Sequence, residues 1–224
     1  MQADLHRWDV TPREAVAIQR ELVGLIRLTP LQKKVQTISA ADCAFIGKKR
    51  ILAAAVLCNA KTLEILDSAT VNRPLMFPYV PGLLSFREAP AVIEAVSKLR
   101  IPGDVLMIDG QGIAHPRGVG LASHVGLWLN VPTIGVAKSR LCGSHRPVGQ
   151  RRGNRSQLVL DGKVIGVALR TRDNVSVLYV SPGHLITLGE CIRLVLRCAP
   201  EYRLPQPSKL AHNMVSMLKS QLVD

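Results

Sequence analysis

Apolar positions near the start of the chain have a helical spacing. Thr11, Pro12 and Glu14 supply an N-cap hydroxyl, a first-turn proline and a capping-box glutamate. Apolar residues then recur every three or four positions, at Ile18, Leu22, Leu25 and Ile26. The pattern predicts an amphipathic helix that ends before Pro30.

The pattern then changes to short apolar or β-branched runs separated by polar turns. Three runs predict an antiparallel meander, although the alanines at 53–55 weaken the middle strand: Val35–Phe45, Arg50–Cys58 and Leu63–Val71. After a proline-rich segment, strand and helix patterns alternate, which favours parallel pairing. Buried strands are expected at Asp104–Ile108 and Thr133–Ala137, with helices at Glu88–Leu99 and Gly118–Leu129.

The last third of the chain adds a hairpin, whose turn is the dipeptide Asp161-Gly162, and two helices. The expected elements are Ser156–Leu160, Lys163–Arg170, Val175–Val180, His184–Arg197 and Lys209–Leu222. No linker, low-complexity tract or internal repeat divides the sequence, so we predict one domain over residues 1–224. Its fold class is α/β, a mixed sheet of three antiparallel strands followed by parallel strands, flanked by helices.

The composition adds a strong positive charge. Lys and Arg total 29 against 16 Asp and Glu, which gives a formal net charge of +13. Such a charge favours a polyanionic partner such as nucleic acid, because each Lys or Arg near a phosphate releases condensed counterions. A generally basic, soluble surface is the alternative interpretation.

Targeting and redox features point to an intracellular setting. No apolar run reaches the ~18 residues that span a bilayer. The N-terminal segment Met1–Arg7 lacks the hydrophobic region of a signal peptide. The five cysteines are odd in number and form no C-x-x-C pair, so we expect reduced thiols and neither a zinc site nor disulfides. These features predict a cytoplasmic protein with no membrane partner.

Three acidic residues occupy unusual positions. Asp42 lies within the apolar first strand, where an ionised carboxylate is costly unless it is paired or binds a metal. Asp109 directly follows a buried strand, and ligands of α/β proteins collect at the carboxyl ends of strands. Glu88 lies at a predicted helix start. Carboxylates from separate elements suit Mg²⁺; the alternatives are an outward-facing acid, an Asp-Gly turn and a first-turn helix glutamate.

Two further segments are candidates for nucleic-acid contacts. Phe77–Gly82 is a proline-bracketed loop whose Tyr79 could enter a base stack, or it is an ordinary packed loop. Lys138 follows a buried strand and could meet a phosphate, or it is simply solvated. The serine-hydrolase elbow, the phosphate-binding loop of nucleoside triphosphatases and the dinucleotide-binding glycine pattern are all absent from the sequence.

Six segments, taken in order, resemble the endonuclease V family, the deoxyinosine 3′-endonucleases. They are Pro78–Gly82, Leu84–Glu88, Asp109–Arg117, Gly120–His124, Gly135–Ser139 and Tyr202–Pro207. The resemblance runs from Thr11 to Leu222. It implies a ribonuclease H-like fold and a DNA-repair endonuclease that uses Mg²⁺, or Mn²⁺ in its place. Such an enzyme hydrolyses the second phosphodiester bond 3′ of a deaminated base and leaves 3′-hydroxyl and 5′-phosphate ends.

The resemblance also implies a set of catalytic residues. Asp42 and Asp109 would be the metal ligands, and Glu88 would close the site through the metal or its waters. His212 resembles the fourth site member, and Lys138 would steady the phosphate. The residues alone predict otherwise for His212, because it lies off the apolar stripe of the last helix and would be a solvated histidine.

Substrate contacts follow from the resemblance in the same way. Tyr79, Val80 and Pro81 are similar to the wedge that enters the gap left by an everted base. The lesion pocket would be lined by Gly82, Leu84, Gly110, Leu121, Leu141 and Gly143. Main-chain groups there could distinguish hypoxanthine from adenine. Position 111 is Gln, where many members have His, and this departure could alter contacts near the lesion or the metal.

Two other functions remain open at this point. Another ribonuclease H-like nuclease, such as a junction resolvase or integrase relative, would share the acids but not the tyrosine wedge. A non-catalytic binder of altered nucleic acid would use the basic surface and wedge alone. We expect the partner to be DNA containing deoxyinosine, with inosine-containing RNA as the other candidate, and we expect the protein to act as a monomer.

Overall fold

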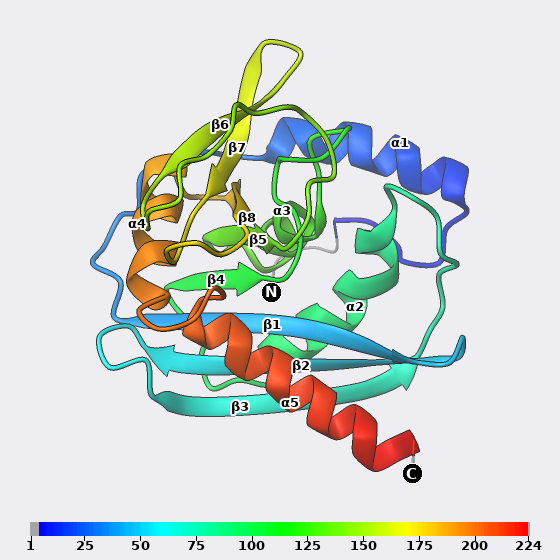
Figure 1. Cartoon of the computed structure of the whole chain (residues 1–224). Helices are drawn as coiled ribbons and strands as arrows, with labels where there is room; N and C mark the ends of the chain where they lie inside the picture. Colours follow the sequence, from blue (N-terminus) through cyan, green and yellow to red (C-terminus); the bar gives the residue numbers. More distant parts are fainter. Residues whose placement is uncertain (1–4, 224) are drawn as a thin grey trace.

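Strands β1 (Thr37–Ile46), β2 (Arg50–Asn59) and β3 (Ile65–Pro74) form the antiparallel meander that the sequence predicts. The computed structural model describes residues 5–223 (Figure 1). Residues 1–4, which belong to the segment considered above for a signal peptide, and residue 224 lie outside the described part. The alanines at 53–55 are fully buried, because helices cover both faces of β2.

The meander continues into one eight-stranded sheet with the order β3-β2-β1-β4-β5-β8-β7-β6. Strands β4 (Val105–Ile108) and β5 (Thr133–Ala137) pair in parallel, as expected. The sheet then returns to antiparallel pairing, in which the predicted hairpin of β6 and β7 is confirmed, whereas the antiparallel pairing of β8 with β5 and β7 was not predicted. The last three strands are β6 (Arg155–Leu160), β7 (Lys163–Leu169) and β8 (Leu178–His184).

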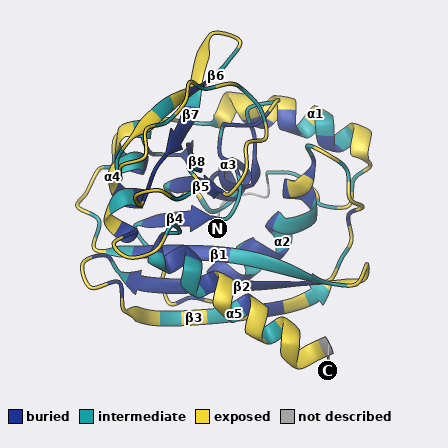
Figure 2. Cartoon of the chain, in the orientation of Figure 1, coloured by how far each residue is buried: buried dark blue, intermediate teal, exposed yellow. Residues whose placement is uncertain are grey.

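Two helical layers cover the sheet (Figure 2). One contains α2 (Leu84–Ser97) and α3 (Leu121–Leu129), and the other contains α4 (Leu188–Cys198) and α5 (Gln206–Val223). Ala41 and Ile108 point to the layer of α2 and α3, whereas Ala40 and Met107 point to the layer of α4 and α5. This alternation places successive residues of β1 in different cores. Within residues 5–223, no helix is both long and apolar enough to cross a membrane.

Helix α1 (Pro12–Leu22) packs outside these layers, at the end of the molecule where α2 begins (Figure 1). Its predicted capping box is confirmed, with Thr11 and Glu14 bonded reciprocally. The helix is shorter than expected, since a 3-10 turn follows at Val23–Leu25 and Ile26 is extended. Gly24, a weak helix former, lies at this change.

Helix α2 begins at Leu84, four residues before the expected start. Its N-cap residue, Leu83, offers no side-chain hydrogen bond, so the usual N-terminal pattern is missing from the sequence. Glu88 is therefore in the second turn, and the interpretation as a first-turn glutamate favoured by the helix dipole is wrong.

Candidate active site

Asp42 and Asp109 are brought side by side by the parallel pairing of β1 and β4. Ala41 is in register with Ile108, and the backbone N–H of Asp109 donates to the Ala41 carbonyl at 3.4 Å. Ala41 and Ile108 both face α2 and α3, so the aspartate that follows each points to the opposite face. The two carboxylates thus meet at the carboxyl end of β4, on the face that α5 covers.

Helix α5 adds His212 to the two aspartates. His212 Nδ1 lies 2.7 Å from Asp42 Oδ2, and a ligand atom of each of the three side chains lies within 4.8 Å of the others. The Asp42 side chain is only 12% exposed, and its other oxygen accepts from the Cys43 backbone N–H at 2.7 Å. The histidine that the sequence alone placed in solvent therefore lies against the site.

Lys138 enters from the end of β5, the next strand of the sheet. Its Nζ lies 2.5 Å from Asp109 Oδ2, in an ion pair that remains partly exposed. The structure thus places this amine beside the carboxylate that ends β4. An amine there can neutralise a carboxylate or a phosphate oxygen that approaches it.

Glu88 completes the acidic group from α2. Burial, and then the charges of Asp42 and Asp109, raise the pKa of Glu88 to about 8, against the opposing charge of Arg87. Burial and the charge of Asp42 also raise the pKa of Asp109, which Lys138 opposes. The raised pKa values of Glu88 and Asp109, both beside Asp42, indicate a group of acids that lacks sufficient positive charge. Two carboxylates and an imidazole converging within bonding reach of one point are donors that fit a divalent cation.

A cavity of about 420 Å³ adjoins this cluster, and Asp109 and Lys138 are part of its wall. Eight of the nine residues expected to contact substrate line it: Tyr79, Val80, Pro81, Gly82, Leu84, Gly110, Leu121 and Leu141. Gly143 is outside this lining, because it packs against β6, where an added Cβ would lie 2.9 Å from the Val159 carbonyl oxygen.

Comparisons with known proteins decide the family. The profile of the family described as Endonuclease V matches residues 20–213. The chain belongs to the endonuclease V family. An endonuclease V from Methanothrix thermoacetophila is 48% identical over 208 residues, 93% of this chain and 92% of that protein. The family confirms that this protein is an endonuclease and that its fold is ribonuclease H-like.

Solved structures agree with the fold described above. The crystal structure of endonuclease V from Streptomyces avermitilis has a TM-score of 0.91 and 36% sequence identity, covering 97% of this chain and 96% of its own. Endonuclease V from Ciona intestinalis, in complex with a 24mer DNA containing an inosine followed by a ribo-adenosine, has a TM-score of 0.80. Its sequence identity is 22%, with 94% and 98% of the two chains covered, so it supports the fold.

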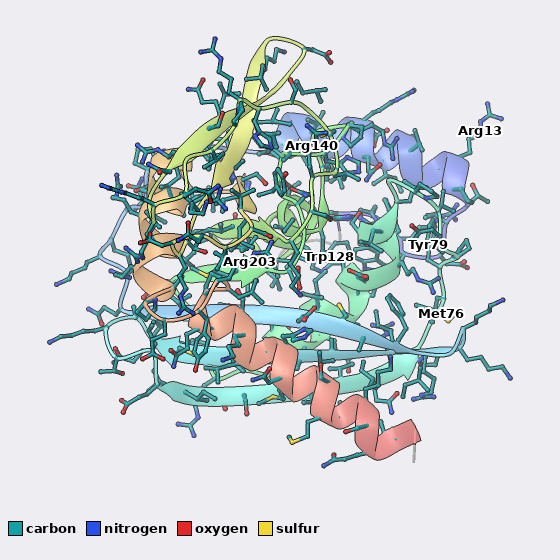
Figure 3. All side chains as sticks on the ribbon, in the orientation of Figure 1. Arg13, Met76, Tyr79, Trp128, Arg140 and Arg203 are labelled. Carbon is teal, nitrogen blue, oxygen red and sulfur yellow. The ribbon has the colours of Figure 1, made fainter. Side chains whose placement is uncertain are left out.

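In this endonuclease, the loop before α2 presents Tyr79 to solvent. The Tyr79 side chain is 72% exposed, and Figure 3 shows it at the rim of the molecule, on the loop between β3 and α2. The loop is anchored below by Phe77 and Leu83, which are buried against Ala15 of α1 and Phe86 of α2. Tyr79 is therefore an exposed aromatic residue on a firmly packed loop, and it does not contribute to the core.

Sequence reasoning missed three side chains next to this loop: Gln19, His115 and Arg117. All three donate to the Gly82 carbonyl oxygen. Gln19 had a detectable feature, since it lies three residues before Leu22 and so falls on the apolar stripe of α1. A polar residue in that stripe indicates a buried hydrogen-bonding role. His115 and Arg117 were only part of a longer motif.

Gln111, the departure noted in the sequence, is 8% exposed and lies on the cavity wall. Its Nε2 donates to the Ser139 carbonyl at 3.0 Å, which joins the loops after β4 and β5. Its Oε1 has no hydrogen-bond partner among residues 5–223. Gln111 therefore links the two loops at the wall of the cavity.

The raised pKa of Glu88 has a consequence for stability. Because this pKa rises from 4.5 to about 8 on folding, its contribution to stability is complete below pH 4.5 and is lost as pH approaches 8. We expect Glu88→Gln to raise the Tm of the metal-free protein at pH 8, by about 2–4 °C for each 1 kcal/mol recovered, and to change it less at pH 5.

Thermal unfolding in chelator at both pH values measures this effect. Glu64→Gln is the matched control, because Glu64 is exposed, directly precedes β3 and is outside the acidic group. A Glu88→Gln protein no more stable than wild type at pH 8 would show that the carboxyl groups do not destabilise one another.

Proposed function

We propose that this endonuclease cuts nucleic acid beside deaminated bases, above all inosine, in a reaction that depends on Mg²⁺ and accepts Mn²⁺. One observation carries the proposal. Asp109 belongs both to the group of carboxylates and to the wall of the 420 Å³ cavity. A site that can hold a base therefore adjoins a site that can hold a cation, as recognition and cleavage on one strand require.

Asp42 and Asp109 would hold the cation, with His212 beside Asp42 and Glu88 closing the site through the metal or its waters. When bound, the cation supplies positive charge to the scissile phosphate and lowers the pKa of the attacking water. The protein's part is to fix the geometry. The register of β1 with β4 sets the two aspartates, and α5 sets His212 against Asp42. Lys138, beside Asp109, would stabilise the charge that develops on the phosphate.

The cavity and the Tyr79 loop support recognition of an everted base. Gly82, Leu84, Gly110 and Leu121 line the cavity, and backbone groups at such positions could distinguish the carbonyl and ring N–H of hypoxanthine from the amino group of adenine. Tyr79, with Val80 and Pro81, would fill the gap in the base stack. Gly143 has no part in this proposal. The inosine-containing DNA held by the Ciona intestinalis protein is consistent with such a substrate.

The position of the cut and its role follow from the resemblance to the family. We propose hydrolysis of the second phosphodiester bond 3′ of the lesion, with 3′-hydroxyl and 5′-phosphate products, as a step of DNA repair. The cluster lies beside the cavity rather than within it, which suits a cut displaced from the recognised base. Inosine-containing RNA is the other candidate substrate. A contact with the 2′-hydroxyl group would distinguish RNA from DNA.

Matched strands of DNA and RNA, each with one inosine or one adenine at the same position, test the function. With Mg²⁺, we expect an inosine-containing strand to be cut at the second phosphodiester bond 3′ of the inosine. With chelator, we expect no cutting. The adenine strands should remain intact. Equal cutting of inosine and adenine strands would contradict lesion recognition, and unchanged cutting in chelator would contradict the metal.

A further inference from the structure

The backbone carbonyl of Gly82 accepts hydrogen bonds from three side chains of two separate segments. Gln19 Nε2, His115 Nε2 and Arg117 Nη2 lie 3.1, 3.0 and 2.6 Å from this oxygen. A peptide carbonyl has two lone pairs, so three donors exceed what one backbone group needs for satisfaction. The cleavage chemistry proposed above uses none of these three side chains.

Gln19 links α1 to this arrangement and is only 1% exposed. Its Nε2 also donates to the Val119 carbonyl at 3.1 Å, and its Oε1 accepts from Arg117 Nε at 2.6 Å. Both N–H groups and the oxygen of the amide therefore have partners. A buried polar group that is fully bonded in this way holds its neighbours in one geometry.

His115 completes the arrangement as a neutral ring. Its Nδ1 accepts from the Arg117 backbone N–H at 3.1 Å, so the hydrogen bonds assign the proton to Nε2, which donates to Gly82. Burial, and then the charge of Arg117, lowers the pKa of His115 to about 4, which keeps the ring uncharged near neutral pH. We call Gln19, His115 and Arg117 the Gly82 clamp.

The clamped carbonyl lies at the base of the Tyr79 loop. Leu83 N–H donates to the Val80 carbonyl at 3.0 Å, with Pro81 and Gly82 at the two middle positions of the turn. Gly82 has φ of +76°, as the third residue of a type II turn requires. Tyr79 directly precedes this turn, so the orientation of the Gly82 peptide sets the direction in which Tyr79 leaves the body of the protein.

We propose that Gln19 is a positioning residue for the wedge, acting with His115 and Arg117 through the Gly82 carbonyl. Helix α1 then supports the strand-opening loop (Figure 1). The proposal rests on the lesion-opening function proposed above. On this proposal, replacing Gln19 slows cleavage only when the Tyr79 ring is present, whereas a purely structural glutamine would act independently of Tyr79.

A thermodynamic cycle tests this assignment on an inosine-containing duplex, with wild type, Gln19→Met, Tyr79→Ala and the double variant. Methionine keeps the length of the side chain and removes its hydrogen-bonding groups. We expect Gln19→Met to slow duplex cleavage about tenfold, as loss of a buried hydrogen bond can. The double variant should be no slower than Tyr79→Ala alone, because the clamp then has no aromatic ring to position.

Leu22→Ala is the matched control, since it loosens the packing of α1 against Val119 and Leu127 but removes none of the hydrogen-bonding groups of the clamp, and it should leave cleavage near the wild-type rate. If Gln19→Met does not fold, Gln19→Glu enters the same cycle, because it keeps the acceptor for Arg117 and removes the donor to Gly82. Normal cleavage by the folded Gln19 variant, or losses that multiply in the double variant, would overturn the clamp. A wild-type enzyme that does not distinguish inosine from adenine would overturn the proposed function instead.

Discussion

Asp109→Asn is expected to abolish cutting of an inosine-containing strand, with a loss on the order of a thousandfold or more, while the protein stays folded and still binds that strand. Asparagine has the shape of aspartate and keeps an oxygen that can accept from Lys138. It removes the negative charge with which Asp109 would share a cation with Asp42. Only the interaction proposed for the reaction is therefore lost.

The same substitution should not lower stability. Burial and the charge of Asp42 raise the pKa of Asp109, so its ionised form is disfavoured in the folded protein. We expect the Tm of the metal-free variant to equal or exceed that of wild type, and its affinity for the strand in chelator to be retained. Cleavage, thermal unfolding and binding measured on one preparation separate a catalytic defect from a folding defect.

Asp161→Asn is the matched control for the change in charge. Asp161 lies in the turn between β6 and β7 with φ of +49°, a conformation that asparagine adopts readily, and it is remote from the acidic group (Figure 1). This variant should cut at the wild-type rate. Normal turnover by Asp109→Asn would show that Asp109 is not a ligand of the cation and would contradict the central argument of the proposed function.

The two aspartates could be found from the sequence because their positions depend on local patterns. A compact apolar strand followed by Asp-Gly marks the end of β4, and an acid within an apolar run marks Asp42. The strand pairing that unites them, Ala41 with Ile108, then follows from the parallel order of β1 and β4. The alternation of strand and helix predicts parallel pairing, but it does not predict that β4 lies next to β1 or which residues are in register.

His212 could not be found in this way. Its position relative to the apolar stripe of α5 is correct, since its side chain is 46% exposed. What the sequence does not contain is the path of α5 across β1, which places the exposed side of the helix beside Asp42. The boundary between β8 and α4 was also predicted wrongly. Strand β8 ends at His184, four residues beyond the predicted end, and α4 begins at Leu188 rather than His184.

Helix α2 shows why element boundaries near the site were hardest to predict. Its start has no capping side chain, and its interior contains Pro90, which usually marks a helix end. Tertiary packing of Phe86 and Ala89 stabilises the first turns instead. That packing places Leu84 at the cavity and Glu88 near the aspartates, so the residues most relevant to function depend on the least local information.

Tyr79→Ala is expected to slow cleavage of an inosine-containing duplex by about tenfold to a hundredfold, because unstacking a base costs a few kcal/mol and the inserted ring offsets part of that cost. The effect should be much smaller on a single strand, where the base is already free to enter the cavity. Tyr79→Phe should restore most of the duplex activity, since stacking needs the ring and not the hydroxyl. Fold stability should not change, as the side chain is 72% exposed.

Met76→Ala is the control that the same segment provides. Met76 is 79% exposed, precedes the proline-bracketed part of the loop and does not line the cavity beside Asp109 (Figure 3). If any exposed apolar side chain here merely enlarged the contact with nucleic acid, both alanine variants would weaken cleavage of duplex and single strand alike. A loss confined to Tyr79→Ala and to the duplex would instead mean that the ring separates stacked bases. Equal losses on both substrates would exclude the wedge and leave the cavity alone to explain recognition.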